Sequence, residues 1–144
     1  MLVQYNTNNS ISNVKANIAP YPFTISRNRI TDETAAVHFL LPEHKLLNYP
    51  NKISAADFEG WIQERSIYNA ENADNHYEKI FSMSDPGEQP QDGSLLFAKY
   101  GKGSVIYTGL VFFRELPAGI PGAYRLFANL LANKKKQEPG KANR

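Results

Sequence analysis

The sequence predicts a layered α/β domain, and three observations lead to this fold class. The chain has 144 residues, of which 42% are hydrophobic and 21% are charged, so it can build one core. Residues 94–108 have the pattern of a β-hairpin, and residues 121–131 have the pattern of an amphipathic helix. A helix with one apolar stripe must bury it against another element, which favours helix-on-sheet packing. We therefore expect a single domain over residues 1–133, followed by a basic, disordered tail over residues 134–144.

Short strands separated by turns are expected in the first part of the chain. Residues 2–5 are a β-favouring run, and residues 35–41 form a second run that a proline closes. Between them, residues 17–34 contain two prolines and little periodicity, which predicts irregular structure. A serine at position 54 can cap a short helix over residues 54–58.

The middle of the chain predicts two further extended segments. Gly60 ends the short helix, and residues 61–65 are expected to be extended. Residues 77–83 are a candidate strand. Residues 85–93 contain Pro and Gly at several positions and therefore form a loop.

The last third of the chain has the clearest pattern. Gly101 and Gly103 can adopt the positive φ of a tight turn between strands over residues 94–100 and 104–108. Pro121 suits the first turn of a helix, where its missing N–H costs nothing. The apolar stripe of this helix is expected to contain Ala123, Leu126, Phe127, Leu130 and Leu131, with Arg125 and Asn129 outside it.

Charge and composition exclude several classes of function. The tail over residues 134–144 carries a charge of +4, which leaves residues 1–133 at −2 in a chain of net charge +2. A body of that sign lacks the basic patch of a nucleic-acid-binding domain. No apolar stretch approaches the roughly 20 residues of a membrane span, so no membrane contact is expected. The N-terminus lacks the pattern of a signal peptide.

The residue types also limit the chemistry. The chain contains no cysteine, which excludes a disulfide framework, a thiolate metal site and a thiol nucleophile. The histidines His38, His44 and His76 share no helical ligand spacing, so they could be metal ligands only if the fold brings them together. No metal and no cofactor are expected. We interpret His38 as a core or interface histidine and place His44 and His76 in polar loops.

Two groups of polar residues are the candidates for a ligand site at the strand ends. They are Gln63, Glu64 and Arg65, beside Glu59, and the pair Arg114 and Glu115. Paired carboxylates can act as acid and base when one has a raised pKa. The alternative interpretation is that these neighbours form structural ion pairs. Trp61, Tyr68 and Tyr77 are either a platform for sugar stacking or part of the core.

Three segments carry a resemblance to a known family. They are residues 46–53 (Leu-Leu-Asn-Tyr-Pro-Asn-Lys-Ile), residues 57–65 (Asp-Phe-Glu-Gly-Trp-Ile-Gln-Glu-Arg) and the more specific residues 112–131 (Phe-Phe-Arg-Glu-Leu-Pro-Ala-Gly-Ile-Pro-Gly-Ala-Tyr-Arg-Leu-Phe-Ala-Asn-Leu-Leu). The chain from Leu2 to Ala132 resembles the C-terminal domain of bacterial PIG-L (LmbE-like) deacetylases. That module is similar to class I glutamine amidotransferase and ThuA-like domains.

The resemblance implies a flavodoxin-like three-layer sandwich, and the chain departs from the family in three ways. It has neither the Asp-Asp loop with paired histidines of the zinc deacetylase domain nor the cysteine nucleophile of glutamine amidotransferases. It also starts at a strand that normally follows one or two βα units. We therefore expect a partial domain with an open sheet edge, which would pair with another copy or an upstream domain. Family members of this type are often periplasmic or extracellular, and the compartment stays open.

These observations lead to three hypotheses. The first is a non-catalytic accessory domain of a PIG-L/LmbE-like deacetylase that packs on a partner or recognises a carbohydrate. The second is a structural oligomerisation domain. The third is a small hydrolase of sugar derivatives that uses Glu64 or Glu115 as acid or base and Arg65 or Arg114 to hold an anionic group.

Overall fold

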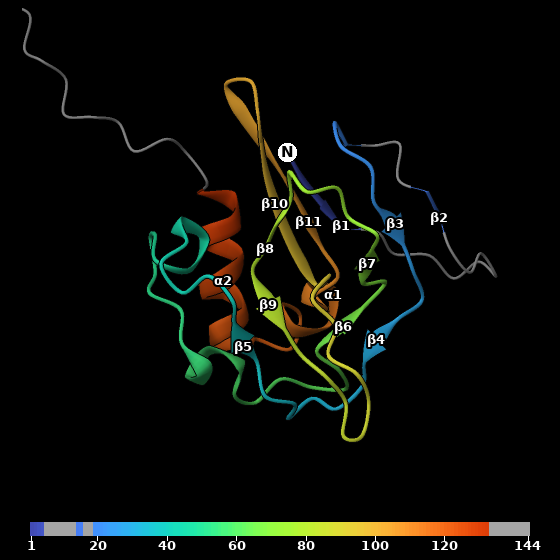
Figure 1. The fold of residues 1–144 in the computed structure, drawn as a ribbon. Helices are drawn as coiled ribbons and strands as arrows, with labels where there is room; N and C mark the ends of the chain where they lie inside the picture. The colour runs from blue at the N-terminus through green and yellow to red at the C-terminus, as the bar shows by residue number, and fades with distance from the viewer. Residues whose placement is uncertain (5–13, 16–18, 133–144) are drawn as a thin grey trace, which may run out of the picture.

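The chain folds around a mixed four-stranded sheet. A computed structural model describes residues 1–4, 14–15 and 19–132, so the predicted tail lies outside the described residues. The sheet has the strand order β1-β11-β10-β8. Its strands are β1 (Leu2–Gln4), β8 (Glu78–Lys79), β10 (Leu95–Tyr100) and β11 (Gly103–Thr108), drawn in Figure 1. The strands β10 and β11 confirm the predicted hairpin. The strand β1 pairs with β11 in parallel, whereas β10 is antiparallel to both of its neighbours.

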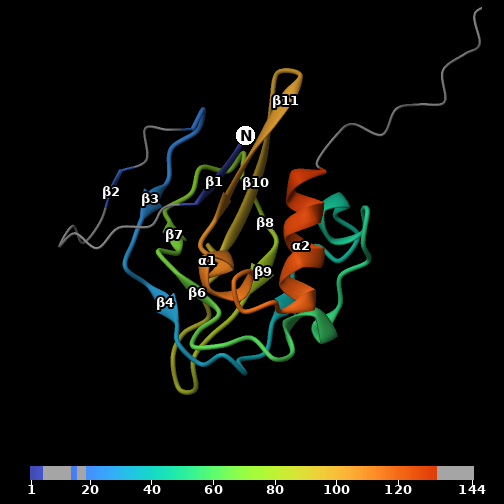
Figure 2. The ribbon, with the colours of Figure 1, turned by 180° about the vertical axis from the view of Figure 1, so that it is seen from behind.

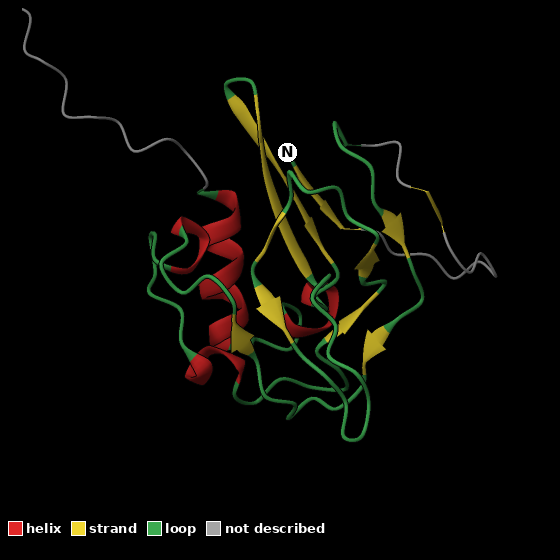
Figure 3. Cartoon of the chain, in the orientation of Figure 1, coloured by secondary structure: helices red, strands yellow, loops and turns green. Residues whose placement is uncertain are grey.

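Three smaller sheets surround this centre. One joins β2 (Val14–Lys15), β3 (Thr24–Ile25) and β7 (Ala70–Glu71). The other two are pairs, β4 (Arg29–Ile30) with β6 (Ser66–Ile67) and β5 (His38–Phe39) with β9 (Phe81–Ser82). Figure 3 shows how much of the chain between these short strands is loop and turn.

Helical structure is concentrated on one side of the central sheet. The 3-10 helices η1 (Lys45–Leu47) and η2 (Ala55–Phe58) pack against α2 (Pro121–Leu131), and the short helix α1 (Phe112–Glu115) precedes α2. In Figure 2, α2 lies on one side of β10 and β11, and β3 and β7 lie on the other. The domain is thus mixed α/β with a mixed sheet and few helices.

Both faces of the central hairpin are buried. Phe97 and Ile106 face the larger core cluster, which includes Leu126 and Leu130 of α2. The neighbouring pair Leu96 and Tyr107 faces a second cluster built with Phe23, Ile25 and Tyr77. This alternation follows from the period of two in a strand, because successive side chains point to opposite faces.

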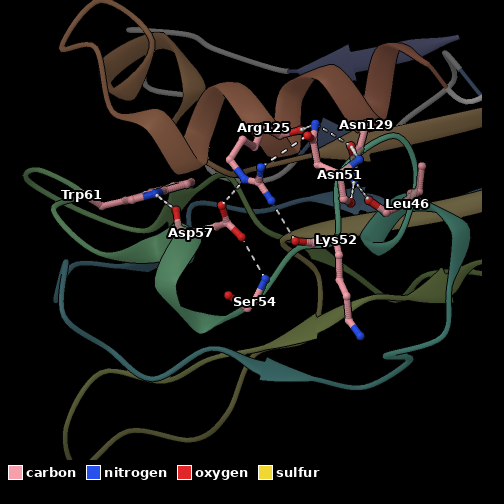
Figure 4. A network of polar contacts seen from close by, with 8 residues as sticks. All are labelled: Leu46, Asn51, Lys52, Ser54, Asp57, Trp61, Arg125 and Asn129. Atoms are coloured by element: carbon pink, nitrogen blue, oxygen red, sulfur yellow. Dashed lines mark hydrogen bonds and ion pairs between the residues drawn. The ribbon is translucent and has the colours of Figure 1, made fainter.

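The helix α2 confirms the predicted segment but corrects two of its positions. Asn129, expected outside the apolar stripe, is 1% exposed, whereas Leu131, expected inside it, is 62% exposed. Figure 4 shows the reason: the Asn129 side chain bonds the loop that holds η1 and η2. Its Nδ2 donates to the carbonyls of Leu46 (2.9 Å) and Asn51 (2.7 Å), and its Oδ1 accepts from the Asn51 amide (2.9 Å). A buried amide is satisfied here by backbone groups that α2 alone could not supply.

The contact between α2 and η2 is equally close. The Arg125 Nε donates to Asp57 Oδ1 at 2.7 Å, and the Trp61 indole donates to the Asp57 carbonyl at 2.9 Å. An added Cβ at Gly122 would lie 1.8 Å from that carbonyl oxygen, so the first turn of α2 requires glycine there. The predicted capping of η2 by Ser54 is confirmed, because Ser54 and Asp57 form a capping box.

Three sequence predictions of strands need correction. The segment 35–41 contains only the short strand β5, and residues 77–83 divide into β8 and β9 around Ile80. The two halves pair with different partners, β10 and β5, so the chain changes sheet there. Residues 61–65 are not a strand, because Gly60 and Gln63 both have positive φ (73° and 66°), which turns the chain.

Among the described residues, no helix combines the length and the apolar character needed to cross a bilayer.

Candidate functional site

The candidate site is built around Glu64, in a segment held on both sides by backbone hydrogen bonds. On one side, the Arg65 amide donates to the Ile30 carbonyl at 2.9 Å, next to the pairing of β4 with β6. On the other side, the Val111 amide donates to the Arg65 carbonyl at 3.2 Å, just before α1. Side chains of β4 and of α1 therefore meet at Glu64.

The Glu64 carboxylate is buried between two arginines. Its side chain is 0% exposed, and its two oxygens accept from different partners. The Nε of Arg114 donates to Oε1 at 3.0 Å, and the Nη2 of Arg29 donates to Oε2. The two arginine side chains are 35% and 46% exposed, so they separate Glu64 from solvent. Pairing and hydrogen bonding of this kind offset the cost of burying a carboxylate.

Gln63 completes the network through an unusual backbone conformation. Its φ is 66°, and the Glu64 amide donates to the Ile62 carbonyl at 2.8 Å, which closes a γ-turn at Gln63. A γ-turn with positive φ is rare and strained for a residue with a side chain. The turn places the exposed Gln63 side chain beside Arg114, whose Nη1 donates to its Oε1.

The other two predicted site residues belong to the interior. The Arg65 guanidinium donates to the carbonyls of Ala35 (3.1 Å) and Phe58 and lies 5.6 Å from the Phe58 ring centre and 5.9 Å from the Trp61 ring centre. Glu115 is fully buried, and both of its oxygens accept from the Ile62 amide at 3.1 Å. The five predicted residues therefore divide into two sets, of which only Gln63, Glu64 and Arg114 join in one network.

Burial shifts the titration of both interior groups. Burial raises the pKa of the Glu115 carboxyl above its ordinary 4.5, although the Ile62 amide and Arg65 partly offset the effect. Burial lowers the pKa of the Arg65 guanidinium, with Asp32 and Glu115 opposing it. A raised carboxyl pKa is typical of a general acid, but a general acid must also reach the proton that it transfers. Glu115 has no exposed surface through which a substrate could contact it.

The histidines and aromatic residues are not part of this cluster. His38 is exposed, which rules out the core alternative, while its interpretation as an interface histidine stays a prediction. His44 caps η1, since its Nδ1 accepts from the Leu46 amide at 3.1 Å while its Nε2 lies 3.2 Å from Glu78. Trp61 and Tyr77 are 3% and 6% exposed and pack in the core, so they cannot form a stacking platform. Within the described parts of the chain, no three acidic or histidine side chains are grouped as metal ligands would be.

Sequence reasoning missed Arg29. It lies 35 positions from Glu64 in a segment that was predicted to be irregular, and its strand has only two residues. The only available signal was the pair of arginines at positions 27 and 29, which does not say which partner they meet. Glu59, considered with the cluster, is exposed.

Comparison with known proteins gives no family assignment. No protein-family model, no curated protein and no solved structure matches the chain significantly.

The arrangement of Arg29, Arg114 and Glu64 is that of a partly exposed arginine pair over a buried counter-ion. Such an arginine pair can bind an oxyanion, whereas the Glu64 carboxylate is already hydrogen-bonded to both arginines.

Proposed function

We propose that this chain is a non-catalytic accessory module, a degenerate amidotransferase-like domain that serves a PIG-L/LmbE-like deacetylase by packing on it or by recognising its carbohydrate substrate. One observation supports the non-catalytic part of the proposal: both candidate catalytic carboxylates are fully buried and hydrogen-bonded to the fold. The role of these two carboxylates is then to hold the arginine side chains and the backbone around them in place.

The hydrolase hypothesis makes a geometric demand that these residues do not meet. An acid or base must come within about 3 Å of the proton it transfers, directly or through one water. Glu64 is enclosed by Arg29 and Arg114, and Glu115 is enclosed by the 58–65 loop through Ile62. To expose either carboxylate, an ion pair or a backbone hydrogen bond would have to break.

The finer fold assignment, a flavodoxin-like sandwich without its first βα units, is part of this proposal. It is supported by the parallel pairing of β1 with β11 and by the burial of both faces of the hairpin. Parallel strands are usually covered on both faces, as here.

A binding measurement tests the proposed partnership. The chain is titrated calorimetrically into a purified zinc deacetylase domain of the PIG-L/LmbE type from the same organism, with an unrelated protein of similar size as the control. We expect a 1:1 complex with a Kd of about 10 μM or tighter. The absence of both a heat of binding and a faster-sedimenting species at about 100 μM would reject partner packing.

A second candidate function, oligomerisation, is favoured by the position of β1. This strand is at the edge of the central sheet, and among the described strands it pairs with β11 alone. An edge strand presents backbone groups to which another strand can add. Light scattering over a concentration series tests this candidate: a stable dimer supports pairing at β1, and a monomer throughout the series rejects it.

A further inference from the structure

We propose that Arg29 and Arg114 form a binding site for the carboxylate group of a ligand, with Glu64 behind them as a fixed counter-ion. The inference rests on the proposed function and deepens it, because it predicts that the recognised carbohydrate is an acidic one. Nothing in the function itself requires a charge on the ligand.

The donors that remain available define the site. Glu64 uses the Nε of Arg114 and the Nη2 of Arg29, and Gln63 uses the Nη1 of Arg114. Among the described residues, no other hydrogen bond or ion pair engages these two guanidinium groups, and that of Arg114 lies 5.1 Å from the centre of the Phe113 ring. A guanidinium has five N–H donors in a planar fork, so one carboxylate on the inner side leaves donors for a second oxyanion.

The charges favour a singly charged ligand. Two guanidinium groups share the single carboxylate of Glu64, which leaves one positive charge without an ion-pair partner in the network. The Asp85 carboxylate interacts electrostatically with Arg29, and the hydrogen bonds that its oxygens accept from Thr31 and Asp32 do not cancel its charge. A monoanionic carboxylate pairs with the second arginine of the network and meets less repulsion from Asp85 than a dianion would.

The backbone around Gln63 supports a role beyond stability. The positive φ of Gln63 is disfavoured for any residue with a side chain, and the turn directs Gln63 and Glu64 toward Arg114. Strained conformations of this kind concentrate where a ligand is held. The segment is also anchored to β4 and to the start of α1, so the arginines keep their spacing before a ligand arrives.

The test is an NMR titration of the ¹⁵N-labelled chain with glucuronate, glucose, acetate and inorganic phosphate. We expect glucuronate to shift the amides of residues 62–66 and 112–115 and the Arg114 side-chain resonance. Glucose should leave the same resonances unmoved, and phosphate should bind more weakly than glucuronate. Arg29→Gln and Arg114→Gln should each weaken glucuronate binding by about tenfold or more, since each removes a charged hydrogen-bond donor.

Two controls keep the result interpretable. Lys102→Gln removes one charge from the exposed hairpin turn and should leave the affinity within about twofold. Each arginine variant retains one partner for Glu64, so it should fold, which a urea titration checks. If either unfolds, Arg29→Lys and Arg114→Lys keep the charge and should still weaken binding roughly threefold.

The outcomes separate this proposal from the proposed function. No shift with either carboxylate, or binding that the arginine variants leave unchanged, overturns the carboxylate site. Phosphate that binds more tightly than glucuronate overturns its preference for a single charge. Acetate that matches glucuronate supports the site and argues against carbohydrate recognition, whereas glucose that binds elsewhere supports carbohydrate recognition without the site.

Discussion

Asn129→Leu is the most informative stability variant of this domain. The leucine side chain has the same branching and the same number of heavy atoms as asparagine but cannot form hydrogen bonds. The replacement would leave the Leu46 carbonyl, the Asn51 carbonyl and the Asn51 amide without the partner that Asn129 provides. At about 1 kcal/mol for each orphaned backbone group, the variant should lose about 3 kcal/mol of unfolding free energy.

The matched control is Leu131→Asn, two positions along the same helix. Leu131 is 62% exposed, so this change should alter the unfolding free energy by less than about 0.5 kcal/mol. Urea unfolding at 25 °C, followed by the fluorescence of the single tryptophan, measures both variants.

The helical pattern of the sequence gives the opposite expectation, since it places Leu131 in the core and Asn129 outside it. An Asn129→Leu variant as stable as the wild type, or a Leu131→Asn variant that loses more than about 2 kcal/mol, would refute the hydrogen-bonding account of this contact.

Three further variants test other parts of the fold. Gly122→Ala places a Cβ against the Asp57 carbonyl and should cost about 3 kcal/mol in urea unfolding, so a neutral result would contradict the close approach. Ser66→Ala removes a buried hydroxyl that has no hydrogen-bond partner among the described residues, so it should be neutral or stabilise by about 1 kcal/mol, and a loss of about 1 kcal/mol would contradict the absence of a partner. Burial lowers the pKa of His44 below 6.5, outweighing Glu78, so its contribution to stability is present above that value and is lost as the pH falls through the folded-state pKa. His44→Asn retains a capping acceptor for the Leu46 amide but does not titrate. Unfolding measured from about pH 7 to about pH 5 should show the wild type losing stability relative to this variant. If the unfolding free energies of the two proteins change in parallel with pH, the lowered pKa of His44 is contradicted.

The parts of the fold that local sequence determines were predictable. The hairpin has glycines in its turn, α2 has a proline at its first position, and η2 has its serine cap. Each signal lies within a few residues of the element that it defines. Asn129 shows the limit of this reasoning, because its burial depends on backbone groups about 80 positions away.

The short strands show the same limit. Residues 77–83 have one continuous β-favouring pattern, yet β8 and β9 pair with strands of different sheets. Pairing partners are set by tertiary packing, which a pattern of period two does not encode.

The candidate site was predictable in part. The sequence indicated polar residues at 63–65 and 114–115 but not which of them point outward. Neighbouring positions diverge: Glu64 meets Arg114, whereas Arg65 and Glu115 turn to the core. Arg29 could not be found, because only the pairing of β4 with β6 brings it to Glu64.

The central proposal is that this chain is a non-catalytic module, and a hydrolysis assay tests it most directly. The purified chain and its Glu115→Gln and Glu64→Gln variants are incubated with chromogenic sugar acetates and glycosides, after urea unfolding has verified that each variant is folded. The account predicts that none of the proteins exceeds the rate in buffer alone. A wild-type rate above that of buffer that falls by about 100-fold or more in a folded glutamine variant would contradict it.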